Sequence, residues 1–202
     1  MRNIITVCKR GTKRTRLYTS EHVNIMKNML DRHGCEYDNF VCISDQTEGM
    51  PSDIELIAIQ DIPQHEGWWA KIETFNPKLP VTGDNLYIDL DCVVVDNLDC
   101  MWDYMPGEPV KLYNVSDFYA NAVGHKYNSS VIRYRISDFT YIWEHYQTDY
   151  AQIQRKYFHG DEQYTSNLDN NSKCFPKEWI INYEHTILQK GLHHMVSLKT
   201  DI

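Results

Sequence analysis

Short apolar runs that alternate with helical patterns are the feature of this 202-residue sequence that most constrains its fold. The runs cover residues 3–8, 39–45, 54–61, 109–115 and 128–136, and their length and β-branched content are typical of buried strands. A helical pattern over residues 19–34 separates the first two runs, and a shorter one over residues 67–77 follows the third. Repeated strand–helix units predict an α/β fold with a Rossmann-like, mostly parallel central sheet flanked by helices.

The two longest helical patterns each have one apolar face. Thr19 or Ser20 can cap the first, and the second runs over residues 137–157. We assign both faces to the hydrophobic core, because aliphatic and aromatic residues at helical spacing usually pack inward. The faces comprise Val23, Met26 and Leu30 in the first pattern and Phe139, Ile142, Trp143, Tyr146, Tyr150, Ile153 and Tyr157 in the second. Residues 168–179 are predicted to form a long loop.

Composition limits the class of protein. With 42% hydrophobic residues the chain can bury a sizeable core, so we expect a single domain over residues 1–202. The six cysteines form no CxxC pair, which favours reduced thiols in the cytoplasm. A net charge of −8 argues against a nucleic-acid partner. The apolar run near the N-terminus is far too short for a membrane span.

The one cluster of cations lies in "KRGTKRTR", residues 9–16, between the first strand and the first helix. Loops at the carboxyl ends of strands line the ligand crevice of an open α/β sheet, and lysine with backbone N–H groups near Gly11 suits a phosphate. A solvated loop without a ligand is the alternative, and the spacing alone does not decide between them.

The second constellation is acidic. Residues 85–99 hold a predicted buried strand that carries four aspartates. Asp89 and Asp91 are two residues apart, so within a strand they face the same side at roughly 6 to 7 Å between Cα atoms. Two such carboxylates favour a bound cation, and all-oxygen ligands suit Mg²⁺ or Mn²⁺. The alternative, aspartates that cap a turn, suits Asp96 and Asp99 better, because Asp89 and Asp91 precede further valines and are predicted to lie inside the strand.

The segment "LYIDLDCVVVDNLD" resembles the DxD segment of GT-A-type glycosyltransferases, in particular the glycogenin-like family 8 enzymes and their relatives in bacteria and phages. Four further segments match in the same order: "CKRGTK", "FVCISD", "GWWAKIETFNP", and "YNSSVIRY" together with "HGDEQ". The resemblance covers residues 4–185. It implies a GT-A-like fold, a nucleotide-sugar donor and a carbohydrate or glycoconjugate acceptor.

The resemblance also implies roles for individual residues. Asp89 and Asp91 would hold Mn²⁺ or Mg²⁺ against the diphosphate of the donor, with Asp89 also near the ribose, and Lys71 would approach the donor. The other donor-binding residues that it implies are Lys9, Thr12, Lys13, Ser44, Asp45, Asn128 and Ser129, of which the last two would hydrogen-bond the transferred sugar. Solvated or capping roles remain the alternative for Lys71 and Ser44.

The resemblance places Asp161 and Glu162 beside the anomeric carbon, and with Asn128 they are the catalytic candidates. Family members commonly carry an Asp-Gln pair, whereas this chain has Asp-Glu. Two carboxylates can stabilise an oxocarbenium-like centre or accept a proton from the acceptor. The downstream match is to retaining enzymes, which implies retention of the anomeric configuration.

The end of the chain departs from the family pattern. Relatives usually finish with a His-Gly segment and then Lys-Pro, whose histidine completes the metal shell, and this chain lacks both. His185 is the substitute that we consider as third metal ligand, with an ordinary surface histidine as the alternative, and His193 and His194 are further candidates.

These patterns together predict a metal-dependent hexosyltransferase that uses a nucleotide sugar, with UDP as the expected nucleotide. A nucleotidyltransferase on a similar sheet is one alternative, although its glycine-rich Arg-Lys signature is absent. A non-catalytic module that binds a nucleotide or sugar is the other.

Overall fold

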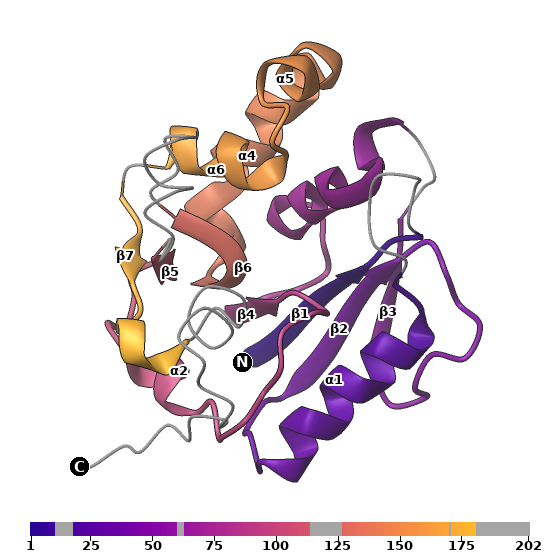
Figure 1. Ribbon diagram of the computed structural model, residues 1–202, viewed down its shortest axis with the longest axis vertical. Helices are drawn as coiled ribbons and strands as arrows, with labels where there is room; N and C mark the ends of the chain where they lie inside the picture. Colours follow the sequence, from indigo (N-terminus) through magenta and orange to yellow (C-terminus); the bar gives the residue numbers. More distant parts are fainter. Residues whose placement is uncertain (11–17, 60–62, 114–126, 170, 181–202) are drawn as a thin grey trace, which may run out of the picture.

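The computed structural model describes residues 1–10, 18–59, 63–113, 127–169 and 171–180 (Figure 1). The N-terminal half forms β1 (Arg2–Cys8), α1 (Ser20–Arg32), β2 (Asn39–Ser44), β3 (Glu55–Ala58), the 3₁₀ helices η1 (Pro63–His65) and η2 (Gly67–Phe75), and β4 (Asp84–Ile88). The C-terminal half forms α2 (Cys100–Asp103), β5 (Val110–Tyr113), β6 (Tyr127–Tyr134), α4 (Ile136–Thr148), α5 (Tyr150–Lys156), α6 (Asp161–Leu168), β7 (Lys173–Cys174) and the 3₁₀ helix η3 (Lys177–Trp179).

The strands form one seven-stranded sheet in the order β3-β2-β1-β4-β6-β5-β7. β1, β2, β3 and β4 are parallel to one another, and β7 is parallel to β5, whereas β6 is antiparallel to both β4 and β5. The predicted α/β class with a mostly parallel sheet is therefore confirmed.

The strand order reverses at β1. The chain builds outward from β1 to β2 and β3 and then returns to place β4 on the other side of β1. In an open α/β sheet the crevice beyond the carboxyl ends of the strands at such a reversal is the usual ligand site. Because β1, β2 and β4 are parallel, the residues that follow them meet at one edge.

Apolar layers cover both faces of the sheet. Alternate residues of the central strands point to opposite faces, so Ile4 and Cys8 of β1 pack in the layer that contains α1, and Ile5 and Val7 in the layer that contains η2 and α4. Thr19 is the N-cap of α1, and the apolar face predicted for this helix is buried. The six cysteines have free thiols. Among the described residues no helix has the length and apolar character needed to cross a bilayer.

The single helix predicted over residues 137–157 is instead two helices. The backbone leaves the helical region at Asp149 (φ −161°, ψ 72°), whose side chain accepts a hydrogen bond from the N–H of Gln152 at 3.0 Å and so begins α5. The apolar face is continuous across this break. Phe139, Ile142, Tyr146, Ile153 and Tyr157 are buried, and Trp143 and Tyr150 pack against them. The predicted core assignment is confirmed, and the predicted loop over residues 168–179 contains β7 and η3.

The prediction that Asp89 and Asp91 lie inside a strand is wrong. β4 ends at Ile88, and the N–H of Cys92 bonds the carbonyl of Asp89 at 3.0 Å, which closes a turn. The physical reason is the loss of neighbours. β1 pairs with β4 only as far as Tyr87, and the register with β6 ends at Ile88, after which the N–H of Asp89 bonds the carbonyl of Ser130 at 2.8 Å. The valines that follow are not strand residues, although Val94 is buried in the layer that contains α1.

Candidate functional site

The site lies at the edge of the sheet where the parallel strands end. Lys9, Asp45 and Asp89 directly follow the carboxyl ends of β1, β2 and β4. β6 runs in the opposite direction, so its amino end, with Asn128 and Ser129, lies at this same edge. The predicted donor-binding residues that the structure describes are thus gathered along one edge.

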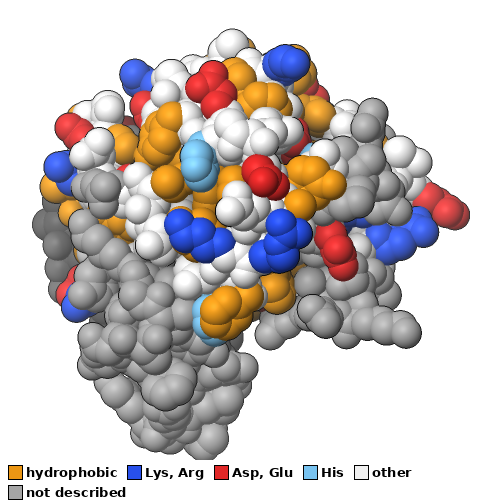
Figure 2. Space-filling model, turned by 90° about the horizontal axis from the view of Figure 1, so that it is seen from above, with side chains coloured by type: hydrophobic (Ala, Val, Ile, Leu, Met, Phe, Trp, Pro, Cys, Tyr) orange, Lys and Arg blue, Asp and Glu red, His pale blue; other side chains and the backbone are white. Residues whose placement is uncertain are grey.

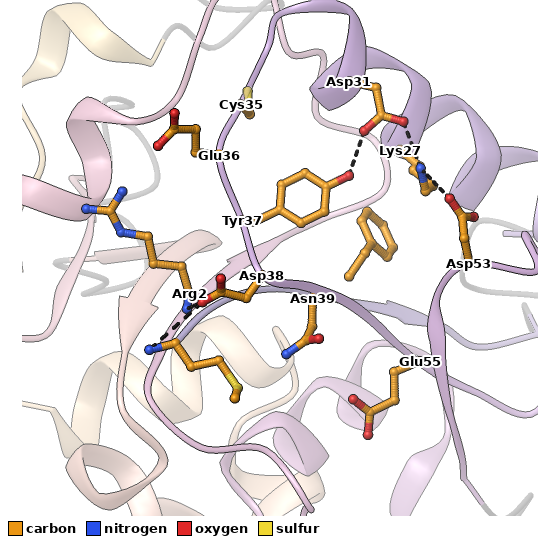
Figure 3. A pocket seen from close by; sticks show the side chains of 12 residues that line it. Arg2, Lys27, Asp31, Cys35, Glu36, Tyr37, Asp38, Asn39, Asp53 and Glu55 are labelled. Atoms are coloured by element: carbon orange, nitrogen blue, oxygen red, sulfur yellow. Dashed lines mark hydrogen bonds and ion pairs between the residues drawn. The ribbon is translucent and has the colours of Figure 1, made fainter.

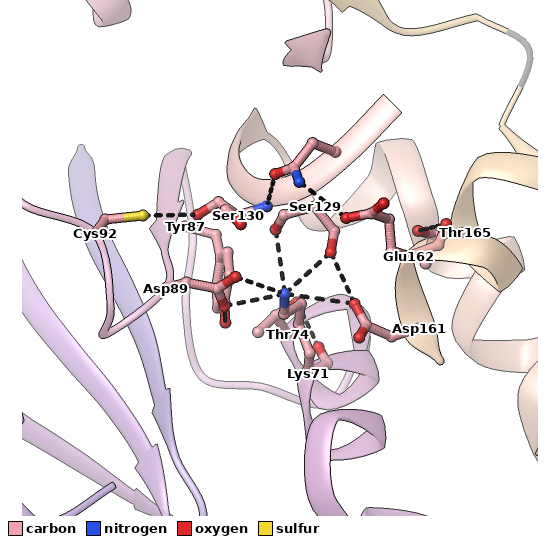
Figure 4. A network of polar contacts seen from close by, with 11 residues as sticks. Lys71, Thr74, Tyr87, Asp89, Cys92, Ser129, Ser130, Asp161, Glu162 and Thr165 are labelled. Atoms are coloured by element: carbon pink, nitrogen blue, oxygen red, sulfur yellow. Dashed lines mark hydrogen bonds and ion pairs between the residues drawn. The ribbon is translucent and has the colours of Figure 1, made fainter. Parts of the chain in front are cut away.

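Lys71, a buried residue of η2, lies at the centre of a polar network at this edge (Figure 4). Its Nζ atom is 3.0 Å from both carboxylate oxygens of Asp89 and 3.0 Å from the Oγ of Ser129. It is also 3.4 Å from the Oδ2 of Asp161. The ammonium therefore joins three segments, the ends of β4 and β6 and the beginning of α6.

The charges in this network do not balance. Burial acts to lower the pKa of Lys71, but the carboxylates of Asp161 and Asp89 outweigh it and raise that pKa, so the ammonium stays charged. Burial also raises the pKa of Asp161, and the neighbouring charge of Asp89 adds to this effect despite the lysine. With Glu162 alongside, three carboxylates face one ammonium. The excess negative charge favours a bound cation or a substrate centre that becomes positive.

The two carboxylates of α6 are tied to β6. Asp161 Oδ2 accepts a hydrogen bond from the Oγ of Ser129 at 3.0 Å, and Glu162 Oε2 accepts one from the Nδ2 of Asn128 at 2.9 Å. The amide oxygen of Asn128 in turn accepts the N–H of Ser130 at 2.8 Å. Of the three catalytic candidates, Asn128 and Glu162 are therefore in direct contact, and Asp161 is held by Ser129, the neighbour of Asn128.

Tyr87 belongs to this network, although the sequence analysis treated it only as part of an apolar strand. Its hydroxyl donates to the Oδ1 of Asp89 at 2.5 Å, and Lys71 Nζ lies 5.2 Å from the centre of its ring. Burial raises the pKa of Tyr87 well above its ordinary value, so the phenol keeps the proton that it donates. The sequence could have indicated this contact, because Tyr87 and Asp89 are two residues apart, and residues at this spacing at a strand end face the same side.

A cavity of about 300 Å³ opens onto the network. Its lining comprises Trp68, Lys71, Asp89, Ser129, Ser130, His159, Asp161 and Glu162. The lysine, Ser129 and Asp161 are buried, whereas Trp68 and His159 are exposed. The cavity thus has a polar floor and an aromatic rim, and the sequence analysis anticipated neither rim residue.

A second polar cluster lies further along the same edge, at the ends of β1 and β2. Lys9 Nζ pairs with Asp45 Oδ2 at 2.8 Å, and Asp45 Oδ1 accepts the N–H of Arg10 at 2.9 Å. Ser44 donates from Oγ to the carbonyl of Cys8 at 2.6 Å, which holds the two strand ends together. The candidates Thr12 and Lys13 lie outside the described residues.

The predicted metal ligands are only partly accounted for. Asp89 and Asp91 lie on one turn, where Asp91 is exposed and the carboxylate of Asp89 contacts Lys71 and Tyr87. The sequence predicted that the two aspartates face the same side of a strand, and they do not. Within the described part of the chain no three His, Cys, Asp or Glu side chains are close enough to hold a metal ion. The other candidates, His185, His193 and His194, lie outside that part.

A larger cavity, of about 810 Å³, lies at the opposite edge, near the amino ends of β1, β2 and β3 (Figure 3). Its charged groups are largely engaged with one another. Lys27 pairs with Asp31 at 2.7 Å and Asp53 at 2.9 Å, and the N–H of Arg2 bonds Asp38 at 2.7 Å. The smaller cavity is therefore the better site candidate, because it combines buried charges with the reversal of strand order.

Comparison with known proteins identifies the fold. No protein-family model and no curated protein matches the sequence. The structure resembles that of the galactosyltransferase LgtC in complex with donor and acceptor sugar analogues, with a TM-score of 0.61 and 12% identity over 87% of this chain and 74% of LgtC. An active-site mutant of LgtC gives a TM-score of 0.62 with 13% identity over 98% of this chain and 80% of that one.

The glycosyltransferase GlyE of Streptococcus pneumoniae TIGR4 gives a TM-score of 0.61 with 13% identity, over 96% of this chain and 51% of GlyE. This chain therefore spans about half the length of GlyE. At such low identities the likeness establishes a shared fold, and the predicted GT-A-like fold is confirmed.

Proposed function

We propose that this protein is a metal-dependent glycosyltransferase that moves a hexose from a UDP-sugar to a carbohydrate or glycoconjugate acceptor, with retention of the anomeric configuration. The observation that carries the proposal is the network of Lys71, Asp89, Asp161, Glu162 and Asn128 at the strand-order reversal. The fold shared with LgtC, whose structure holds donor and acceptor sugar analogues, supports it.

The nucleotide would bind along the edge formed by β1 and β2. Lys9, Ser44 and Asp45 offer one cation and several hydrogen-bonding groups there. Asp89 and Asp91 would hold Mn²⁺ or Mg²⁺, with His185 as the candidate third ligand, and a divalent cation in that place stabilises the negative charge that develops on the leaving diphosphate. Lys71 contributes a fixed positive charge beside it, and its three donors also hold Asp89 and Asp161 in place.

The transferred sugar would occupy the cavity floor. Asn128 and Ser129 can hydrogen-bond its hydroxyl groups, since Ser129 lines the cavity and Asn128 contacts Glu162, which also lines it. Asp161 and Glu162 would stabilise positive charge at the anomeric carbon, because they supply the negative charge that exceeds that of Lys71. NMR of the anomeric proton of the product tests retention, and an inverted linkage would refute that part of the proposal.

A thermal-shift comparison tests donor and metal together. We expect UDP with Mn²⁺ to raise the melting temperature of the wild type, because a ligand that binds the native state stabilises it by mass action. Asp91→Asn should abolish the Mn²⁺-dependent shift and leave the ligand-free melting temperature unchanged, since Asp91 is exposed. Release of UDP from UDP-glucose or UDP-galactose should fall in parallel.

Asp99→Ala is the matched control. Asp99 Oδ1 accepts the N–H of Glu36 at 2.7 Å, away from the site, so this variant should lose some stability and keep its response to Mn²⁺. A wild-type melt that ignores Mn²⁺ and UDP, ADP and GDP alike would contradict the proposal. Binding without any release of UDP would support a non-catalytic module instead.

A further inference from the structure

Exposed aromatic side chains gather at the rim of the cavity. Trp68 is 43% exposed and Phe158 is 70% exposed, and the rings of Phe158 and His159 lie 4.0 Å apart between centroids. Trp68 and His159 both line the cavity. The view of the molecule from above shows hydrophobic side chains beside histidine and charges of both signs (Figure 2). Neighbouring apolar groups that stay in contact with water commonly mark a binding surface.

The adjacent tryptophan shows that Trp68 is not needed for the core. Trp69 is 7% exposed and stacks on Tyr146, with 5.5 Å between centroids and 9° between ring planes. Trp69 thus packs in the apolar layer, whereas the exposed indole of Trp68 is not part of that packing.

The backbone fixes where Trp68 lies. In a 3₁₀ helix, side chains three residues apart lie one above the other, so Trp68 and Lys71 share a face of η2 and both reach the cavity. The indole also packs on the backbone of Gly160, where a Cβ atom would be 2.3 Å from its Nε1. Gly160 has φ +98°, a conformation that favours glycine, and directly precedes Asp161. The indole is therefore set beside the acidic pair.

We infer that Trp68, with His159 beside it, is the stacking platform of an acceptor subsite that binds a sugar ring; this inference rests on the function proposed above. A pyranose has an apolar C–H face and a rim of hydroxyl groups. The face of an indole can stack on the C–H face of the sugar. Glu162 and Ser130, which line the same cavity, can hydrogen-bond its hydroxyl groups. The buried polar floor is suited to the sugar being transferred, whereas the exposed rim is open to an acceptor that arrives from solvent.

Binding of disaccharides tests the inference. The probes are lactose, maltose, cellobiose and chitobiose, observed by saturation-transfer difference NMR with UDP and the diamagnetic Mg²⁺ present. We expect the wild type to bind at least one of them. Trp68→Ala should weaken that binding about tenfold, and Trp68→Phe, which keeps an aromatic face, should weaken it less than threefold. Tyr141→Ala is the matched control, since Tyr141 is also 43% exposed, and should bind as the wild type does.

Calorimetry with UDP and Mn²⁺ on the same four proteins separates this inference from the proposed function. We expect equal UDP affinity in all of them and a folded Trp68→Phe protein by circular dichroism. Disaccharide binding that is absent from the wild type, or equal in the wild type and Trp68→Ala, would overturn the inference. A loss of UDP affinity in Trp68→Ala would also overturn it, because the indole would then serve the donor. Failure of the wild type to bind UDP would instead count against the proposed function alone.

Discussion

Asp161 and Asp169 are both buried and both have a lysine partner, yet the protein shifts their pKa values in opposite directions. Burial and the charge of Asp89 raise the pKa of Asp161. For Asp169 burial acts in the same sense, but the ammonium of Lys111 at 2.6 Å and the hydrogen bonds from Ser172 outweigh it and lower the pKa. Burial thus opposes the ionised form of Asp161, whereas Lys111 favours the ionised form of Asp169, although burial lowers the pKa of that lysine.

Replacement of Asp161 by Asn should separate function from stability. A raised folded-state pKa means that stability falls as pH rises from the ordinary value of 3.8 through the folded value. Asp161→Asn should therefore melt at or above the wild-type temperature at pH 7, and this difference should vanish below about pH 3.8, while sugar transfer is lost. Melting temperatures measured across pH check this, and a strongly destabilised variant at pH 7 would contradict it.

Asp169→Asn should behave in the opposite way. A lowered folded-state pKa contributes stability that is present above the ordinary value of 3.8 and lost as pH falls through the folded value. The substitution leaves the ammonium of Lys111 buried without its anionic partner, so we expect a loss of about 3 to 5 kcal/mol at neutral pH. Urea unfolding at pH 7 and at pH 3 measures it, and equal losses at the two pH values would be inconsistent with this account.

Tyr87→Phe should weaken donor binding with little effect on the fold. The phenol orients the carboxylate of Asp89. Direct loss of a hydrogen bond to a charged group removes roughly 1.5–3 kcal/mol, which is more than tenfold in affinity. Because the phenol acts on the donor only through Asp89, we expect the smaller loss of about three- to tenfold in UDP affinity with Mn²⁺. Tyr134→Phe is the control, because that buried hydroxyl donates at 2.9 Å to the carbonyl of Thr74 and not to a carboxylate. It should lower stability and leave UDP binding unchanged. The reverse pattern in calorimetry would assign Tyr87 a purely structural role.

At the scale of single elements, the break between α4 and α5 depends on one side chain. Asp149→Ala removes the acceptor for the N–H of Gln152 and should cost about 1 kcal/mol, the usual value for loss of an N-cap. Glu144→Ala, on an exposed position of α4, should change stability by less than about 0.5 kcal/mol. Thermal melts followed by circular dichroism compare the two, and equal effects would mean that packing alone maintains the break.

Elements with a strong local pattern were predictable, and element ends that depend on distant neighbours were not. β1, β2 and α1 agree with the sequence analysis, because apolar periodicity and a capping residue specify them locally. The end of β4 is set by where its two neighbouring strands stop pairing. The valines that follow β4 in the sequence do not indicate where this pairing stops.

In the candidate site, the residues were predictable from the sequence but their contacts were not. The sequence analysis named Lys71, Asp89 and Asp161 from a resemblance, but their mutual contacts join positions up to 90 residues apart and follow only from the sheet order. Trp68 was missed because the exposure of one of two adjacent tryptophans depends on which face of η2 meets α4.

At the scale of the whole molecule, the central strands connect the two apolar layers. Alternate residues of β1, β2 and β4 belong to opposite layers, so neither layer can lose its packing without disturbing the strands that support the other. We therefore expect one cooperative unfolding transition for the described part of the chain.

Tryptophan fluorescence can test this cooperativity. Trp69 reports on the layer that contains η2, and Trp102 on the layer that contains α1. Variants in which one of these two tryptophans is replaced by phenylalanine should give the same urea midpoint as circular dichroism of the same variant. Midpoints that differ between the two probes would show that the layers unfold independently.

The network around Lys71 also has an entropic consequence. A free lysine side chain samples many rotamers, and ordering it costs roughly 1.5–2 kcal/mol. Here two carboxylates and the hydroxyl of Ser129 already restrict the ammonium, so that loss belongs to folding and is not repeated when a ligand arrives. A hydroxyl group of a bound ligand that accepts a hydrogen bond from this ammonium would meet a donor that is already in position, and the affinity gained from one contact would be correspondingly larger than at a mobile surface lysine.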